Sequence, residues 1–244
     1  MINRVIAPML IKDGVLVQSK KFKWHLPIGN IEESAIQLEY FNIDEFALIS
    51  IDGMKNSCVD TEQLKRLRKV ASHPITYAGG VTNLDQLRIA FDVGAERVVV
   101  NRMLDEKLDE VEVFTNLVGR QGIVGSIDIK FDKNGNFYVK THENIRSLDI
   151  SHVRDVSSIV GEINIGIIDW EGSVEPYESR KILSTLRKLI QNINCPVTLY
   201  GGSFWFNYNN LAADNTMKIS IMVDNILSYK EDSVNDFKEK LTSL

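Results

Sequence analysis

The sequence contains one short pattern twice, half its length apart. "PITYAGG" spans residues 74–80 and "PVTLYGG" spans residues 196–202 of a 244-residue chain, which places Pro74 and Pro196 122 positions apart. Each copy is a strand-like run that ends in two glycines. A repeat at this distance predicts a fold assembled from two similar halves.

Eight short apolar segments predict eight strands, and most are rich in Ile, Val and Leu, as in parallel sheets buried on both faces. They span residues 4–10, 46–52, 74–78, 97–101, 123–130, 163–169, 196–200 and 218–224. Helical patterns lie between them, at residues 31–41, 61–71, 84–93, 178–191 and 233–241. This β-then-α alternation favours a closed (β/α)8 TIM barrel. Since no linker interrupts the chain, we expect one domain, 1–244, with half-barrels at approximately 1–119 and 120–244.

The halves also agree at other ordered places. "DEFALISID" (44–52) matches "GEINIGIID" (161–169), and "VVVNRML" (98–104) matches "IMVDNIL" (221–227). Tight-turn signals, Asp13-Gly14 and Asn134-Gly135, follow the first strand of each half. Chance similarity between strand-rich segments is the alternative, but agreement at four ordered places favours a duplication.

Composition excludes several classes of protein. The net charge of −5 argues against non-specific nucleic-acid binding, which needs a basic face. Cys58 and Cys195 offer neither a disulfide framework nor metal-ligand spacing. No apolar run approaches the roughly 18 residues of a membrane span, and the N-terminus lacks a signal-peptide profile. We therefore expect a cytoplasmic protein without metal, other cofactor, nucleic acid or membrane.

Candidate anion-binding residues follow the third and fourth strands of each half, where barrel active sites lie. Gly80 and Gly202 end the two Gly-Gly pairs, and glycines let backbone N–H groups approach an anion. Asn101 and Asn225 precede helical segments, whose N-termini favour phosphate. The symmetric pair suits a ligand with a phosphate at each end. The alternative is that the glycines only permit tight turns.

Asp128 closes the fifth strand and is the candidate general acid or base. The alternative is a structural aspartate that accepts hydrogen bonds from loop amides. Lys12 and Lys130 follow corresponding strands and could neutralise a phosphate or be solvated.

Four charged residues lie at the opposite, N-terminal ends of the strands: Arg4, Glu45, Arg97 and Glu162. If they point inward, they can close a ring of ion pairs across the barrel bottom. If they point outward, they are separate surface groups. A buried ring is costly unless its charges are mutually paired.

These motifs resemble those of HisF, the cyclase subunit of imidazole glycerol phosphate synthase. The resemblance covers almost the whole chain and is carried by "RVIAPMLIKDG", "AGGVTN", "GAERVVVN", "SIDIK", "YGG" and "DFKEKL". It implies a duplicated half-barrel that binds a long bisphosphate at its mouth. It also implies a glutaminase partner under the barrel bottom, ammonia passing through the core, catalytic aspartates on strands one and five, and a charged ring that gates ammonia entry.

By this resemblance, Asp128 is the strand-five catalytic residue. Gly80, Asn101 and Gly202 fall on phosphate-binding positions, and the four charges at the strand starts fall on the ammonia gate. The departures gather on the reacting face: Leu10 replaces the strand-one aspartate, Gln18 the first-loop lysine, and Glu171 an aspartate in "DWEG", while Asp224 precedes Asn225.

Because loss of a general acid or base costs about 10²–10⁴-fold in rate, we expect standard cyclisation to be very slow. The chain most resembles a HisF-like branch that works with a glutaminase and a sugar-amidating enzyme in surface polysaccharide biosynthesis. Two alternatives remain open at this point. One is a working cyclase in which Asp52 or Asp169 takes the strand-one role. The other is a non-catalytic barrel that binds a phosphorylated metabolite or another protein.

Overall fold

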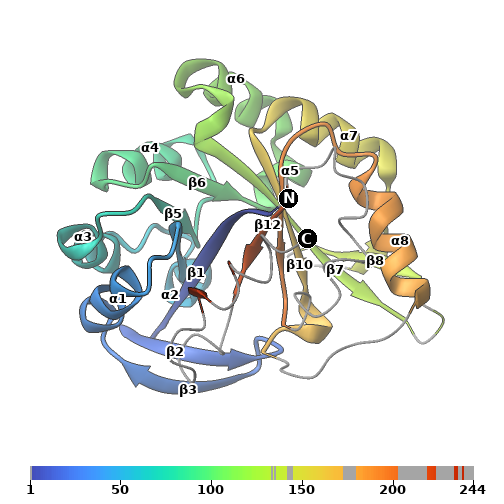
Figure 1. The fold of residues 1–244 in the computed structure, drawn as a ribbon. Helices are drawn as coiled ribbons and strands as arrows, with labels where there is room; N and C mark the ends of the chain where they lie inside the picture. The colour runs from blue at the N-terminus through green and yellow to red at the C-terminus, as the bar shows by residue number, and fades with distance from the viewer. Residues whose placement is uncertain are drawn as a thin grey trace.

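Eight parallel strands form a closed barrel in the computed structural model (Figure 1). The structure describes residues 2–132, 134, 136–141, 145–172, 180–202, 219–223, 234, 235 and 238. The barrel strands are, in order, β1 (Ile2–Lys12), β4 (Glu45–Ser50), β5 (Ile75–Ala78), β6 (Arg97–Val100), β7 (Ile123–Phe131), β10 (Glu162–Ile167), β11 (Val197–Tyr200) and β12 (Ile219–Met222). Because β12 pairs in parallel with β1, the sheet has no open edge among these strands. The predicted (β/α)8 barrel is confirmed.

Helices cover the outside of the barrel (Figure 1). The longer ones are α1 (Ile31–Tyr40), α3 (Thr61–Val70), α4 (Leu84–Val93), α6 (Leu108–Val118), α7 (Ile150–Ile159) and α8 (Arg180–Ile190). The shorter elements are α2 (Ile51–Asn56), α5 (Arg102–Glu106) and the 3₁₀ turns η1 (Arg120–Gly122) and η2 (Ile168–Trp170). Asn30, Asp60 and Asn83 cap α1, α3 and α4 by accepting a backbone N–H with their side chains. None of the helices in the described residues is long and apolar enough to cross a membrane.

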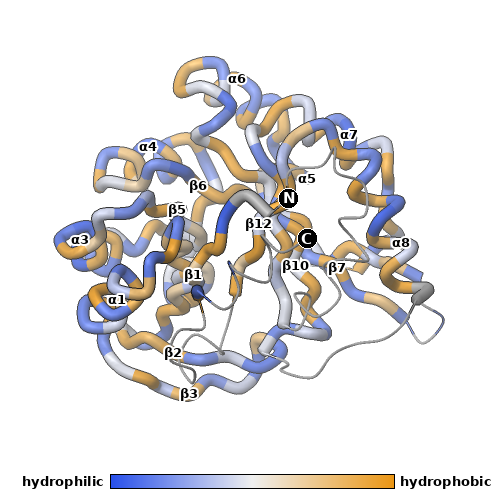
Figure 2. Tube along the Cα trace, in the orientation of Figure 1, coloured by the Kyte–Doolittle hydropathy of each residue, from blue (hydrophilic) through white to orange (hydrophobic). Residues whose placement is uncertain are grey.

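The hydrophobic core has two parts. The larger one lies between the barrel and the helices, and Figure 2 shows hydrophobic stretches along the strands with mixed colours on the outer helices. The smaller one, which we call the inner cluster, consists of Ile6, Leu10, Val17, Ala47, Ile49, Tyr200 and Met222. All seven are at most 7% exposed, so much of the barrel interior near β1 is apolar.

Two antiparallel additions to the barrel were not predicted as strands. β2 (Val15–Lys20) and β3 (Trp24–Gly29) extend β1, while β8 (Phe137–Lys140) and β9 (Ile145–Ser147) extend β7. Asp13 and Gly14 join β1 to β2 with φ angles of 51° and 73°, which fits the predicted tight turn. The corresponding Gly135 lies outside the described residues, as does most of the predicted helix at 233–241.

The two halves repeat their contacts as well as their strands. Asp52 accepts a hydrogen bond from the Gly14 N–H at 3.1 Å, and Asp169 accepts one from the Phe131 N–H at 3.3 Å. In each half, the aspartate that follows the second barrel strand therefore holds the backbone at the C-terminal end of the first strand or just beyond it. This supports a barrel built from two similar half-barrels.

The Gly-Gly pairs have a steric cause. Gly79 and Gly201 have φ angles of 126° and 125°, and Gly80 and Gly202 both have 75°. A Cβ on Gly79 would overlap the Ser50 carbonyl, and one on Gly201 would overlap the Ile167 carbonyl. Both overlaps occur at the end of the preceding barrel strand. The repeated glycines thus allow each turn to pack directly against its neighbour's backbone.

Replacing Gly80 by alanine is expected to destabilise the fold by more than about 3 kcal/mol. The left-handed backbone alone costs about 1–2 kcal/mol, and the new Cβ would also overlap the carbonyl oxygens of Gly53 and Cys58. Gly14→Ala is the matched control, because Gly14 has nearly the same φ, 73°, but its Cβ would meet its nearest atom at 3.9 Å. Urea denaturation measures the free energy of unfolding of both variants. Equal losses of stability in Gly80→Ala and Gly14→Ala would show that overlap with the neighbouring carbonyls is not the cause.

Candidate functional site

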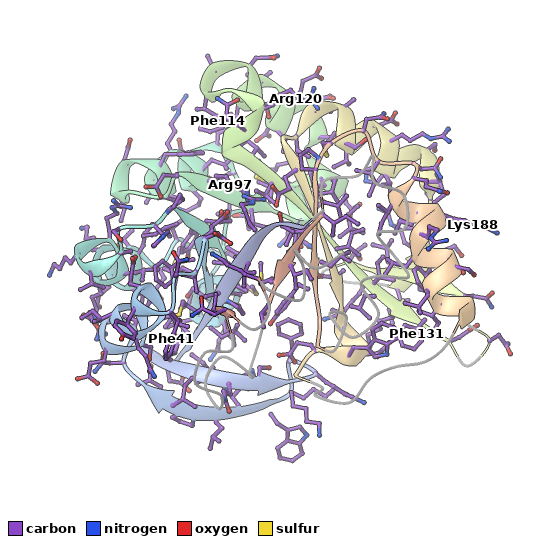
Figure 3. All side chains as sticks on the ribbon, viewed as in Figure 1. Phe41, Arg97, Phe114, Arg120, Phe131 and Lys188 are labelled. Carbon is purple, nitrogen blue, oxygen red and sulfur yellow. The ribbon has the colours of Figure 1, made fainter. Side chains whose placement is uncertain are left out.

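The four charged residues at the strand starts meet across the barrel bottom. We call this set, Arg4, Glu45, Arg97 and Glu162, the charged ring. An Arg4 Nη1 lies 2.6 Å from Glu45 Oε2, and Arg97 lies 3.1 Å from Glu45 and 2.8 Å from Glu162. Arg4 also contacts Glu162, which completes the ring. Figure 3 shows Arg97 pointing from β6 toward the middle of the barrel.

Hydroxyl groups complete the hydrogen bonding of the charged ring. Thr76 donates to Glu45, and Thr198 donates to Glu162, so the two carboxylates have matching partners in the two halves. The arginines are arranged differently: Arg4 donates its Nε–H to Ser220 at 3.2 Å and Arg97 donates its Nε–H to Thr76 at 3.2 Å. Every ring member is therefore held by a charge of opposite sign and by a hydroxyl.

This pairing explains how carboxylates can be buried here. The side chains of Glu45 and Glu162 are only 3% and 5% exposed, whereas those of Arg4 and Arg97 are 24% and 17% exposed. A buried carboxylate is strongly unfavourable without partners, and each of these contacts two guanidinium groups. The arginines reach solvent while closing the bottom of the interior, as expected for a barrier between the interior and the surface below.

A cavity of about 390 Å³ opens at the other end of the barrel. Its described lining comes from the C-terminal ends of the barrel strands and from the β2–β3 and β8 extensions, and we call it the mouth cavity. At its deepest it reaches Val99, Ser126 and Asn164. Val99 and Asn164 follow Arg97 and Glu162 by two residues, which is about 7 Å along a strand. The mouth cavity thus ends one layer of side chains above the charged ring.

Asp128 lies on β7 in the wall of the mouth cavity. Its carboxylate accepts a hydrogen bond from the Asn101 amide at 3.4 Å, and the same amide donates to the Ser126 carbonyl at 3.0 Å. Burial raises the pKa of Asp128 to about 6, although Lys140 and the Asn101 amide act in the opposite direction. A carboxyl group with a pKa near neutrality suits proton transfer, and the acid–base role of Asp128 stays a prediction.

Across the barrel, Leu10 occupies the place where the resemblance expects a second carboxylate. It is 2% exposed and packs in the inner cluster with Ile6, Ile49, Tyr200 and Met222. An aspartate there would be buried among apolar side chains. The residues that surround this position are therefore suited to a leucine and not to a carboxylate.

Asp52 and Asp169, the two alternatives for the strand-one role, both contact backbone amides. Asp52 accepts the N–H of Gly14, just after β1, and Asp169 accepts the N–H of Phe131, the last residue of β7. Neither aspartate is among the described residues that line the mouth cavity. Their contacts indicate a structural role in both halves.

The predicted phosphate-binding residues are only partly brought together. Gly80 and Asn101 both line the mouth cavity, near the cationic side chains of Arg102 and Lys140. Gly202 has the same left-handed conformation as Gly80. Asn225, with the preceding Asp224, lies outside the described residues. Phosphate binding by these residues stays a prediction, because the glycines already have a steric role.

The β2–β3 hairpin forms part of the mouth, which the sequence did not indicate. The fully buried Glu171 accepts hydrogen bonds from the Phe22 N–H at 2.6 Å and from Ser19 Oγ at 3.2 Å. The Lys21 N–H donates to the Glu171 carbonyl at 2.9 Å. Phe22 packs edge-on against Tyr200 with ring centroids 5.9 Å apart. Glu171, which departs from the family pattern, therefore fixes the hairpin over the barrel.

Comparison with known proteins identifies the family. Residues 4–214 match the family described as histidine biosynthesis protein. This chain belongs to that family. Proteins named "Putative imidazole glycerol phosphate synthase subunit hisF2" are similar to this HisF-like barrel. The protein from Campylobacter jejuni is 29% identical over 204 residues, which cover 82% of this chain and 79% of the relative's own length. The protein from Vibrio vulnificus is 29% identical over 205 residues, which cover 82% of this chain and 73% of the relative's own length.

The similarity also extends to proteins named as the synthase subunit HisF itself. The Francisella philomiragia protein of that name is 26% identical over 253 residues, covering 98% of this chain and 96% of its own length. The alignment therefore spans both halves of the barrel. The expected kinship with HisF, including proteins of the hisF2 type, is confirmed.

The raised pKa of Asp128 predicts a pH-dependent effect of Asp128→Asn on stability. Since the folded pKa, about 6, lies above the ordinary value of 3.8, the folded state loses stability as pH rises from about 4 to 6. The substitution removes that loss and is expected to raise the free energy of unfolding by about 1–3 kcal/mol at pH 7.5 and by little at pH 4. Asp155→Asn, on the exposed face of α7, is the control. A stabilisation that does not vary with pH would contradict the assignment.

Proposed function

We propose that this chain is the barrel subunit of a glutamine-dependent complex, in the cytoplasm, that delivers ammonia to a sugar for surface polysaccharide biosynthesis. A HisH-like glutaminase docks under the charged ring and releases ammonia there. The ammonia crosses the barrel to the mouth cavity, where a phosphorylated ligand or a sugar-amidating enzyme receives it. Imidazole glycerol phosphate cyclisation is lost or nearly so.

The observation that carries this proposal is the contrast between the two ends of the barrel. At the bottom, all four charges of the ring are present and mutually paired. At the mouth, one of two expected catalytic carboxylates is Leu10, buried among apolar residues. A chain that kept only its fold would have no need for a ring of buried charges, which apolar residues could replace at no cost in stability.

The interior between the two ends supports passage of a small molecule. The mouth cavity reaches down to Asn164 and Ser126, which are neighbours in the β7–β10 register. Glu162 and Asp128 lie below and above them on the same two strands. Polar groups thus follow one side of the interior from the charged ring to Asp128, while the inner cluster occupies the side near β1 and β12.

A working cyclase is the less favoured alternative. It needs a second acid or base opposite Asp128, and the two aspartates proposed for that role are engaged with backbone amides. A non-catalytic barrel that only binds a metabolite or protein fits the mouth cavity but leaves the charged ring without a purpose.

Co-expression with a HisH-like glutaminase tests the proposal. We expect the two proteins to co-purify, and we expect the complex to hydrolyse glutamine faster than the glutaminase alone. Glu45→Gln, which removes one anion facing two arginines, should weaken this stimulation at least about tenfold, the effect of about 1.4 kcal/mol. Glu110→Gln, on an ion pair of α6 whose glutamate is 43% exposed, is the matched control.

No complex and no stimulation with any HisH-like glutaminase encoded beside this chain would reject the proposal. If the Glu45→Gln variant stimulates glutamine hydrolysis as strongly as the unchanged chain, the glutaminase remains the partner but the charged ring has no role in the stimulation.

A further inference from the structure

His25 is placed on the mouth by the alternation of β3. Trp24, Leu26 and Ile28 are 77%, 59% and 38% exposed and share one face of the strand. His25 projects from the opposite face, is half-buried and lines the mouth cavity. The hairpin fixed by Glu171 therefore brings an imidazole to the mouth.

Lys12 orients this imidazole. The Lys12 ammonium lies 3.3 Å from Nδ1 of His25, and Lys12 is two residues beyond Leu10 on the same face of β1. An ammonium group only donates hydrogen bonds, so Nδ1 must accept. Burial and the Lys12 charge lower the pKa of His25 against the weaker opposing effect of Asp13, which favours the neutral ring. A neutral ring that accepts at Nδ1 carries its proton on Nε2.

The Nε2–H of His25 is then a hydrogen-bond donor for which the described residues supply no acceptor. The atom is buried and has no hydrogen-bond partner among the described residues. A buried donor without a partner is unfavourable, so a ligand oxygen that accepts this hydrogen bond would bind more tightly. Through its contact with Lys12, which is two residues beyond Leu10 on β1, the ring of His25 lies on the side of the mouth where the carboxylate is missing.

We propose that His25, held by Lys12, binds a phosphate oxygen of the ligand through its Nε2–H. The Lys12 ammonium makes this part of the mouth favourable for an anion, and Leu10 removes the carboxylate that would have repelled it. Lys140 and Arg102 line the mouth on the side of Asp128. The chain has replaced a proton-transferring group by a binding group, so that the phosphate lies nearer to β1 than the Gly-Gly turns would place it. The inference rests on the part of the proposed function in which the mouth receives a phosphorylated ligand.

Nitrogen NMR of the full chain labelled with ¹⁵N-histidine tests this without any assay of activity. His25→Gln assigns the His25 signals. We expect the neutral Nε2–H tautomer at pH 7.5 and a shift of the Nε2 signal on titration with ribose 5-phosphate or inorganic phosphate, but not with ribose. Lys12→Met should lose the tautomer preference.

Affinity provides the second measurement. His25→Phe should weaken ribose 5-phosphate binding about tenfold or more, whereas His73→Gln, at a histidine that contacts Glu39, should leave it unchanged. An Nδ1–H tautomer, or phosphate binding that leaves His25 unmoved, would overturn this inference while keeping a phosphorylated ligand. Absence of phosphate binding at millimolar concentration would overturn both, and neither result bears on docking of the glutaminase.

Discussion

The charged ring is the interaction on which the rest of the structure depends. Glu45 and Glu162 start β4 and β10, on opposite sides of the barrel, and each is neutralised by both arginines. Such pairing requires a closed barrel of the right circumference, because Arg4 must reach partners on two different strands. Because of the charged ring, the bottom of the barrel is closed by ion pairs and not by apolar side chains. These ion pairs form a polar barrier between the interior and the surface below.

From this barrier upward, the interior is divided lengthwise. Polar residues, Glu162, Asn164, Ser126 and Asp128, follow β7 and β10, whereas the inner cluster fills the side near β1 and β12. Leu10 belongs to the apolar side and packs against other apolar side chains there. The whole side of the interior around Leu10, and not this one position alone, is therefore unsuited to a carboxylate. On the polar side, burial raises the pKa of Asp128 to about 6.

Much of the barrel could be predicted from sequence because its strands are buried on both faces and are therefore nearly continuous in apolar residues. All eight were located, and Asn30, Asp60 and Asn83 begin helices that start one residue later. The β2–β3 hairpin was missed since β3 is mostly exposed, contains Pro27 and turns its apolar residues Trp24, Leu26 and Ile28 outward. The helix after Asn101, α5, was expected, whereas α2, α6 and α7 were missed although Asp149 caps α7 and Gly119 ends α6.

The four members of the charged ring could be predicted from the sequence, but the orientation of their side chains could not. A charged side chain at the start of a strand can point into the barrel or out to solvent. Asp128 was predicted from its place at a strand end. His25 and Glu171 could not be assigned roles in the same way, because their partners, Lys12 for one and residues 19–22 for the other, meet only after the hairpin folds over the mouth. Long-range contacts of this kind carry no local sequence signal.

In the proposed complex, the barrel conducts ammonia but no longer completes the cyclisation for which its HisF relatives are named. The most direct measurement supplies the complex with amide-¹⁵N-labelled glutamine and the bisphosphate substrate of imidazole glycerol phosphate synthase, and follows the label. We predict labelled ammonia and glutamate in equal amounts, with cyclised product at least about 10²-fold below a HisF control measured alongside. Label incorporated into imidazole glycerol phosphate at the control's rate would contradict the account.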